Sequence, residues 1–336
     1  MDPLTHTLTG VALSRAGLNR WYPPGAAALV VAAAIPDIDV VTRLWGSATN
    51  LHYHRHLTHS LVMMPVMALV AVLVVALVTS RRLNWKRAWA MALIGVASHI
   101  AIDFCNSYGV RPFLPFSDRW YYLDITSLYD AWIWAVLLVA ALAPALARLV
   151  SSEIGARPGS GRGLAIFALV FFVGFSFYRY LLHERAVAVL ESRLYHGAAP
   201  ARVAAFPSRV SPWRWNGLVE TPAFYSLHTI NLNAEFDPGS GRLLYKPELG
   251  PEEAVAWEAA RQTRDFQVFL RFARFPFRRF ERLEEPEPGV RVEVSELRFG
   301  EPPHAPFTVV AVVGPDGRVR ESRFAFRPGR DRQTPR

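Results

Sequence analysis

The sequence predicts a mainly α fold, a polytopic transmembrane helix bundle followed by a smaller extracytoplasmic α+β domain. Charge is split unevenly: residues 1–182 hold 14 of the 37 Lys and Arg, leaving 23 for residues 183–336. Long apolar runs are confined to the first part. These two observations favour a transmembrane domain over residues 1–182, a soluble domain over 183–327 and a disordered tail over 328–336.

Two short helices are expected first. The first covers Leu4 to Leu18 and begins just after a proline, which suits a helix start. The second covers Gly25 to Ile35 and ends before Pro36, because the residue before a proline disfavours the α conformation. Each is short for a full span, so the pair is expected to form a half-inserted hairpin.

Four longer segments are expected to cross the membrane. The run Leu61 to Thr79 has 19 residues without a charge, which as an α-helix span about 28 Å, close to the hydrocarbon thickness. Ala131 to Ala147 and Gly163 to Leu182 follow the same pattern. Ala88 to Ile102 is shorter and carries His99, so its polar face is expected to point into the bundle.

The distribution of basic residues predicts the orientation of these spans. Arg and Lys gather between the first two long spans, before the last span and beside the N-terminal hairpin, at Arg81, Arg82, Lys86, Arg87, Arg148, Arg157, Arg162, Arg15 and Arg20. The positive-inside rule makes these three loops cytoplasmic. The opposite ends of the helices, and the soluble domain, are then extracytoplasmic. The chain is therefore expected to be a multi-pass protein of the inner or plasma membrane.

The soluble part shows strand and helix patterns. His183 to Tyr195 is expected to continue the last span out of the membrane, and Glu252 to Ala273 is expected to be a helix. Alternation of apolar and polar residues predicts strands over Phe224–Phe236, Val290–Phe299, Phe307–Val313 and Arg318–Arg327, the last two joined by a hairpin turn at Gly314–Gly317.

Composition also excludes some functions. The net charge of +9 does not indicate a nucleic-acid partner, because the basic residues are scattered and lack interleaved stacking aromatics. Cys105 is the single cysteine, so neither an intramolecular disulfide nor a cysteine-based zinc site is possible.

Four groups of histidine and aspartate lie at the edges of the apolar segments or inside them. They are His6; Asp37 and Asp39; His52, His54, His56 and His59; and His99 with Asp103. Each such group costs roughly 2.5–3.5 kcal/mol at membrane depth. A divalent metal ion would offset this cost, because imidazoles and carboxylates are its natural ligands. The sequence therefore predicts one shared metal site near the extracytoplasmic surface.

Local spacing suggests individual roles within that site. His99 and Asp103 are four residues apart on a helix and share a face. Asp37 and Asp39 point apart in an extended segment unless the loop folds, so one is expected to ligate while the other orients a histidine or takes a proton. Thr58 or Ser60 is expected to cap the helix from Leu61. The N-terminus of that helix and the charge of Arg55 would then favour the binding of an anion such as phosphate nearby.

These segments carry a family resemblance. MDPLTHTLTG, IPDID, HRHLTHS and SHIAIDFCNSYGVRPFLPFSDRWYYLD resemble, in this order, the motifs of the YdjM-like family of membrane-bound metal-dependent hydrolases, over roughly residues 1–130. The resemblance, which extends loosely to zinc-dependent phospholipase C, implies the ligands His6, Asp37, Asp39, His54, His59, His99 and Asp103. His56 stands where the family has glycine, which leaves open whether His54 or His56 faces the metal.

The functional expectation is a membrane-embedded metal-dependent hydrolase. One or two divalent ions, zinc as first choice, would activate water to attack an ester or phosphoester of a lipid or lipid-linked substrate. Asp37 or Asp39 would be the general base and Arg55 would assist catalysis. The rivals are a non-catalytic scaffold with a structural metal and a metal transporter. The cytoplasmic halves of the helices are almost purely apolar, which disfavours transport.

Overall fold

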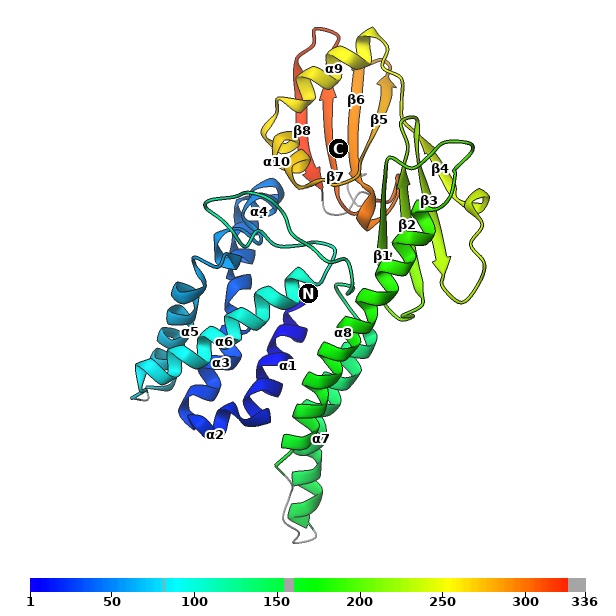
Figure 1. Cartoon of the computed structure of the whole chain (residues 1–336). Helices are drawn as coiled ribbons and strands as arrows, with labels where there is room; N and C mark the ends of the chain where they lie inside the picture. Colours follow the sequence, from blue (N-terminus) through cyan, green and yellow to red (C-terminus); the bar gives the residue numbers. More distant parts are fainter. Residues whose placement is uncertain (81, 154–159, 326–336) are drawn as a thin grey trace.

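The computed structural model describes residues 1–80, 82–153 and 160–325. The first part is helical and the second contains two sheets (Figure 1). The helical elements are α1 (Pro3–Leu13), a π-helical turn (Ser14–Leu18), α2 (Asn19–Trp21), a 3-10 turn (Pro23–Gly25), α3 (Ala26–Ala32), the 3-10 helix η3 (Ile35–Trp45), α4 (Ser47–Tyr53), the 3-10 turn η4 (Leu57–His59), α5 (Met64–Thr79), α6 (Trp85–Phe104), α7 (Ala131–Glu153) and α8 (Arg162–Glu191).

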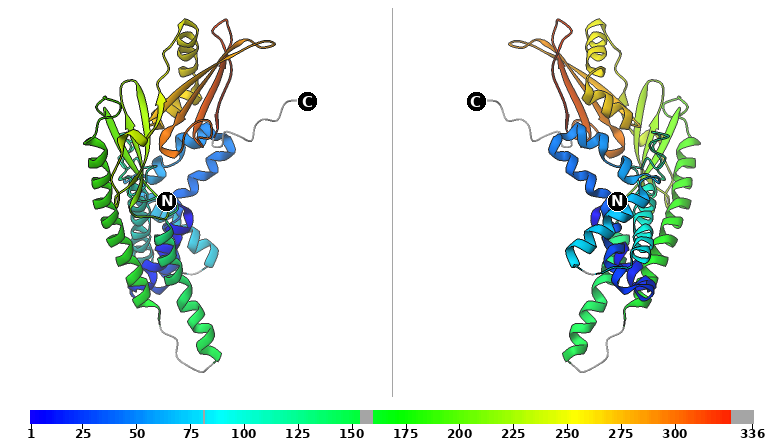
Figure 2. Two further views of the ribbon diagram at one scale, coloured as in Figure 1. Left: turned by 90° about the vertical axis from the view of Figure 1, so that its right-hand side faces the viewer. Right: turned by 90° about the vertical axis from the view of Figure 1, so that its left-hand side faces the viewer.

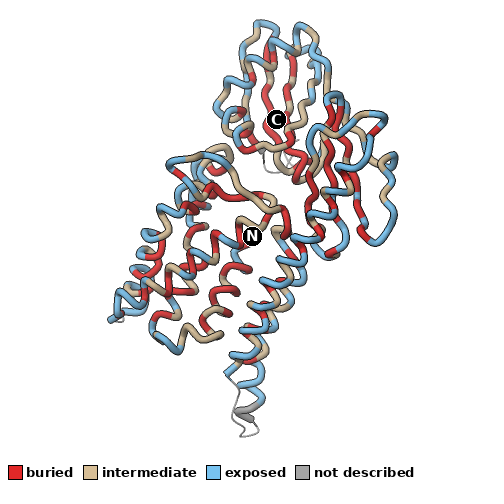
Figure 3. Tube along the Cα trace, in the orientation of Figure 1, coloured by how far each residue is buried: buried red, intermediate tan, exposed pale blue. Residues whose placement is uncertain are grey.

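Several of these elements are long and apolar enough to cross a membrane. Among the described residues they are Pro23–Trp45, Trp85–Phe104, Ala131–Val150 and Arg162–Glu191, with a fifth candidate in which Ser47–His59 and Met64–Thr79 meet at a bend of 92°. The outward faces of α7 and α8 are exposed (Figure 3), and they present apolar side chains such as Leu142, Leu146, Phe167 and Val170. This confirms the helical membrane bundle of the predicted fold class.

The segment around Pro36 corrects the expected short hairpin. The α-helix does end before Pro36, at Ala32. The chain then continues as the 3-10 helix η3 and does not become extended. Proline is compatible with the first turn of a helix, where no backbone N–H is needed, and Pro36 lies there in η3. The second N-terminal segment is therefore longer than predicted, and Asp37 and Asp39 lie in a helical turn rather than in an extended strand.

The start of α5 also differs from expectation. The helix begins at Met64, not Leu61, and no side chain caps it. Ser60 instead stabilises the preceding turn, because its hydroxyl accepts a hydrogen bond from the Met63 N–H and donates one to the Leu57 carbonyl. The Thr58 hydroxyl is directed to Asp39 and is not a helix cap.

Small residues allow the helices that carry the histidines and aspartates to pack closely. At Gly95 of α6, an added Cβ would lie 2.5 Å from the Leu29 carbonyl oxygen and 2.9 Å from the Ala32 Cβ of α3. At Gly10 of α1, it would lie 2.9 Å from the Ala33 Cβ. Close backbone approach at small residues is typical of membrane helix packing. This close packing brings α1, η3 and α6 together, so that their histidine and aspartate side chains lie near one another.

The second part of the chain holds two four-stranded antiparallel sheets and two helices. The first sheet has the order β1 (Arg202–Pro207), β2 (Arg214–Glu220), β3 (Phe224–Asn231) and β4 (Arg242–Tyr245), and the second β5 (Pro276–Leu283), β6 (Gly289–Glu296), β7 (Thr308–Val313) and β8 (Val319–Ala325). Helices α9 (Pro251–Arg261) and α10 (Arg264–Phe272) lie between the sheets in sequence and share an apolar core with the second sheet. This confirms the coarse prediction of an α+β domain.

Details of this part depart from the sequence prediction. The single helix expected over 252–273 is divided, because Thr263 accepts a hydrogen bond from the Phe266 N–H and starts α10. The strand expected to reach Phe236 ends at Asn231, and β1, β2, β4 and β5 were not predicted. The β7–β8 hairpin forms as expected, with Gly317 at a positive φ of 72°. The tail predicted over 328–336 lies outside the described residues.

The sheets sit on one end of the helix bundle (Figures 1 and 2). Helix α8 runs unbroken past residue 182 and packs against the first sheet, where Leu190 joins Trp215 and Ile230 in one core. The guanidinium of Arg179, which is buried in α8, donates hydrogen bonds to the carbonyls of Ile125, Ser208 and Ser211. This contact joins both parts of the chain.

Candidate metal centre

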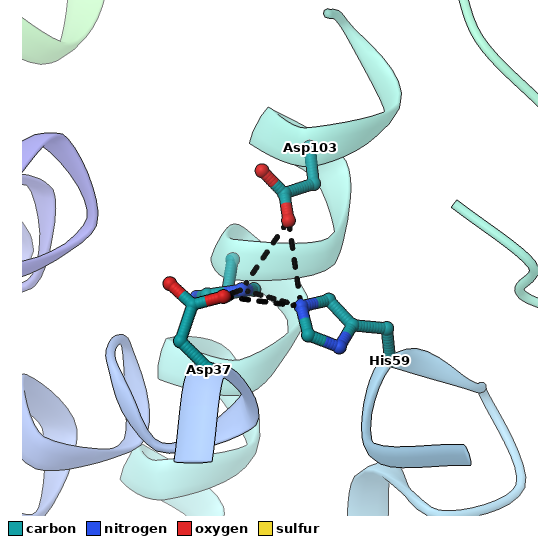
Figure 4. Close-up of side chains that lie close together, drawn as sticks. Asp37, His59 and Asp103 are labelled. Carbon is teal, nitrogen blue, oxygen red and sulfur yellow. Dashed lines mark hydrogen bonds and ion pairs between the residues drawn. The ribbon is translucent and has the colours of Figure 1, made fainter. Parts of the chain in front are cut away.

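Four side chains from three segments converge in the helical part. They are Asp37 of η3, His59 of η4, and His99 and Asp103 of α6, and Figure 4 shows Asp37, His59 and Asp103 directed at one another. Each offers one ligand atom, and these atoms all lie within 4.8 Å of one another. His59, His99 and Asp103 are fully buried, whereas the Asp37 side chain is 17% exposed. The predicted pairing of His99 with Asp103 on one helix face is present.

The distances within this four-residue cluster are short. His59 Nε2 lies 3.0 Å from His99 Nε2. Asp103 Oδ2 lies 3.4 Å from each of these nitrogens, and Asp37 Oδ1 lies 3.5 and 3.6 Å from them. Ligand atoms about 2.1 Å from a tetrahedral metal ion lie about 3.4 Å from one another, so these separations leave room for one small ion among the four atoms.

For neutral rings, the contacts made by Nδ1 indicate which nitrogen carries the proton. His99 Nδ1 lies 2.8 Å from the Ala33 carbonyl, which can only accept, so Nδ1 is the donor and Nε2 holds a lone pair. His59 Nδ1 lies 3.0 Å from the Thr58 hydroxyl, which itself donates to Asp39 Oδ2. His59 Nε2 is then also an acceptor.

Four electron-rich atoms therefore face one another inside the bundle. With both rings neutral, two imidazole lone pairs and two carboxylate oxygens repel unless a metal ion lies among them or one ring nitrogen is protonated. Asp103 Oδ2 is buried and accepts no hydrogen bond within the described part of the chain. The donor set thus fits a divalent metal ion, which supports the predicted cofactor.

A second group adjoins the first. Asp37, Asp39 and His54 also offer ligand atoms within 4.8 Å of one another. Asp39 Oδ1 lies 2.9 Å from His54 Nδ1, and Asp39 Oδ2 accepts hydrogen bonds from the Arg55 N–H and the Thr58 hydroxyl. Both carboxylate oxygens of Asp39 are therefore already engaged by neighbouring protein groups. Asp37 belongs to both groups, which is the arrangement of a carboxylate that bridges two ions.

His6 and Arg55 surround the other oxygen of Asp103. The His6 ring stacks on His99 with centroids 3.7 Å apart, and its Nε2 lies 3.2 Å from Asp103 Oδ1. Its Nδ1 is buried and has no hydrogen-bond partner among the described residues. The amino group of Met1 also contacts Asp103 Oδ1. His6 thus borders the four-residue cluster without being one of its converging ligands.

Arg55 does not occupy the place that the sequence suggested. Its guanidinium is buried, lies 2.9 Å from Asp103 Oδ1 and donates to the Asn106 side chain and the Gly109 carbonyl. Its charge is therefore balanced inside the protein instead of facing an anion. Because α5 begins beyond Ser60 as well, the expected phosphate site between Arg55 and a helix terminus is not formed.

His56 is separated from the metal ligands. Its ring lies against His52 and Tyr53, with centroids 5.5 and 5.8 Å away, and it belongs to neither group. Arg55 adopts a positive φ of 54°, which reverses the chain between His54 and His56. His54 is thus the histidine that faces the carboxylates, and this turn favours His54 over His56 as the candidate ligand.

Three further residues support the centre and were not predicted as members of it. Thr58 links Asp39 to His59. Asn106 is buried, donates to Asp103 Oδ1 and accepts from Arg55. Tyr108 stacks over the Arg55 guanidinium at 4.7 Å and extends into the core of the second sheet. For Asn106 the signal was its position three residues after Asp103, just beyond the end of α6 at Phe104.

The fold and the cluster define a helical membrane protein with a candidate metal centre. The chain matches the sequence model of the family described as YdjM inner membrane protein over residues 1–185, and it belongs to this family. It is also similar to the uncharacterized protein YfhP of Bacillus subtilis strain 168, at 25% identity over 335 residues, covering 96% of this chain and 94% of the relative. No solved structure matches the chain. The family membership confirms the resemblance, and the family name agrees with an inner-membrane location.

Proposed function

We propose that this protein is a membrane-embedded metal-dependent hydrolase that cleaves an ester or phosphoester of a lipid or lipid-linked substrate at the extracytoplasmic surface. The observation that supports this proposal is the convergence of four acceptor atoms from Asp37, His59, His99 and Asp103. A site with two histidines and carboxylates suits Zn²⁺. Asp37, Asp39 and His54 would hold a second ion beside the first.

A metal ion bound here would lower the pKa of a coordinated water to about 7 and polarise the bond to be cleaved. Neighbouring groups orient the two histidines that would bind the metal. The Ala33 carbonyl orients His99, and Thr58 with Asp39 orients His59. The Asp37 side chain is the most exposed of the four converging ligands, so we assign the approach of substrate to its side.

The two aspartates predicted as general base differ in their surroundings. Both oxygens of Asp39 already receive protein hydrogen bonds, which makes it a positioning residue. The contacts of Asp37 with His59 and His99 are both made by its Oδ1. When a single ion is held at Asp37 Oδ1, Asp37 Oδ2 is left to accept the proton, and we assign the general base to it in that one-ion site.

Exposed apolar side chains beside Asp37 support a lipid substrate. Along η3 they are Ile38, Val41, Leu44 and Trp45, and Leu57 and Leu61 follow near His59. A contiguous apolar surface next to an accessible ligand would accept acyl chains while a polar head reaches the carboxylates.

The arrangement of charge supports the extracytoplasmic placement. The basic residues near α2 and the start of α6 lie at the end of the bundle opposite the sheets (Figure 1). The metal ligands lie nearer the sheets, at the ends of η3 and α6. With basic ends in the cytoplasm, the centre and the sheet domain both face outward.

The test is metal analysis of the detergent-purified protein together with a panel of phosphoester and lipid substrates. We expect His99→Ala and Asp103→Asn to lose the metal and hydrolysis. Thr58→Val should weaken metal binding by about 10–100-fold, because it removes only an orienting contact. His56→Ala is the matched control and should keep both properties.

Full hydrolysis by a metal-free His99→Ala variant would overturn the mechanism. Retained metal without hydrolysis of any substrate would instead indicate the structural scaffold, since a closed structural site has no exchangeable water. Metal uptake into reconstituted vesicles would indicate a transporter.

A further inference from the structure

A cavity of about 900 Å³ lies outside the metal centre, between the two sheets and the segment that joins α6 to α7. Asn216 and Thr229, which pair across β2 and β3, line one wall. They alternate with Trp215 and Ile230, which pack toward α8, so they point to the other face of the sheet. Ser107 and Ser127 border the cavity from the membrane part, and Leu297–Glu301 lies opposite.

The charge of this cavity is strongly positive. Arg209, Arg214, Arg242 and Arg298 line it, and Glu301 is the one carboxylate among its lining residues. Arg242 is paired with Glu301 at 2.7 Å, and the buried Arg298 is paired with Glu296 at 2.8 Å.

Two arginines of the cavity remain without a counter-ion. The side chains of Arg209 and Arg214 are exposed and have no ion-pair partner among the described residues. The neighbouring hydroxyl and amide groups of Ser208, Asn216 and Thr229 add hydrogen-bonding capacity. Paired guanidinium groups next to neutral donors are the preferred environment of a phosphate or phosphate ester.

The β1–β2 turn places these arginines at the end of the membrane helices. The Arg209 carbonyl accepts a hydrogen bond from the Ala131 N–H at the start of α7, and the Val210 carbonyl accepts one from the Trp132 indole. Val210 and Trp213 are exposed between the two arginines. Exposed aromatic and apolar side chains flanked by basic residues are typical of a segment at the lipid headgroup level.

We propose that the β1–β2 turn and the cavity behind it bind the phosphate-bearing headgroup of an anionic membrane lipid. Arg209 and Arg214 would contact the phosphate, Asn216 and Thr229 the remaining polar part of the headgroup, and the acyl chains would follow the exposed apolar faces of α7 and α8. This binding site involves none of the metal ligands and does not depend on the proposed hydrolysis.

The test uses the full-length protein in a neutral detergent and calorimetric titration with short-chain phosphatidylglycerol, short-chain phosphatidylcholine and inorganic phosphate. We expect phosphatidylglycerol to bind, and the double variant Arg209→Ala, Arg214→Ala to bind it about 30-fold more weakly, from two lost charges near the membrane surface. Thr229→Trp, which fills the cavity without changing charge, should also weaken binding. Arg318→Ala removes an exposed arginine from the β7–β8 hairpin, away from the cavity, and should leave the affinity unchanged.

Equal affinity of the double variant and the unaltered protein would overturn the proposal. Equal binding of phosphatidylcholine would show that the anionic headgroup is not recognised, and so would also contradict it. Inorganic phosphate that binds as tightly as phosphatidylglycerol and displaces it would identify a soluble phosphate site and exclude the lipid.

Discussion

Single residues in this protein have roles that depend on the atoms they touch rather than on their type. Asp37 and Asp39 are two positions apart, yet one lies between the two ligand groups and the other is held by the Arg55 N–H, Thr58 and His54. His54 and His56 are also two positions apart in the sequence, and only His54 contacts a carboxylate. Neither difference is visible in composition or spacing.

His228 of β3 provides a prediction at this scale. Burial lowers the pKa of His228 to about 4, and its ring lies between those of Tyr195 and Phe236. A histidine in the unfolded chain titrates near 6.5. The folded state therefore keeps this ring neutral, and the stability that it contributes is complete above pH 6.5 and is lost as the pH falls toward 4.

We expect His228→Gln to have a flatter decline of the thermal unfolding midpoint between pH 6.5 and 4 than the unaltered protein. His304→Gln, at an exposed position, should keep the original slope. Identical slopes for His228→Gln and the unaltered protein would show that this ring does not titrate with unfolding.

At the scale of elements, the candidate metal centre depends on how closely the helices pack. Residues from η3, η4 and α6 meet because α3 and α6 approach at Gly95, where the Leu29 carbonyl fills the space of a side chain. The 3-10 path after Pro36 then carries Asp37 to His59 and His99. The position of one glycine and one proline thus decides the geometry of ligands several residues away.

Gly95→Ala is expected to destabilise the protein by about 1–3 kcal/mol, because the added methyl group meets backbone that cannot move without shifting α3. The same shift should lower the metal content of the purified protein. Thermal unfolding and metal analysis measure the two effects. The control is Gly174→Ala of α8, where no atom lies within 4 Å of the added Cβ and stability should hold or rise slightly. Equal metal content and stability in both variants would contradict this account.

At the scale of the whole molecule, the sheet domain and the metal centre lie at the same end of the bundle (Figures 1 and 2). Tyr108 connects them, since its ring contacts His54 and Arg55 on one side and Phe272 of α10 on the other. Arg298 adds a hydrogen bond to the Ser107 carbonyl. The orientation of this end in the membrane follows from the proposal and is open to direct measurement.

In a Cys105→Ser background, we expect Arg318→Cys to react with a membrane-impermeant maleimide in intact cells. Lys86→Cys, at the basic end of the bundle, should react only after the membrane is permeabilised. Both positions are exposed in the fold, so a difference in labelling reports the side of the membrane. Labelling in the reverse pattern would place the sheet domain and the metal centre in the cytoplasm.

The sequence by itself determined the helical membrane part, the α+β part and the residue types of the candidate metal centre, including the His99–Asp103 pair. These follow from apolar length, charge distribution and helical spacing, which are local properties of the chain. Only the tertiary structure shows that Asp37 rather than Asp39 joins both groups, that His54 rather than His56 lies beside the carboxylates, and that Arg55 pairs with Asp103 in the interior. These outcomes depend on contacts between η3, η4 and α6 and on one residue with positive φ, and neither has a periodic signal in the sequence.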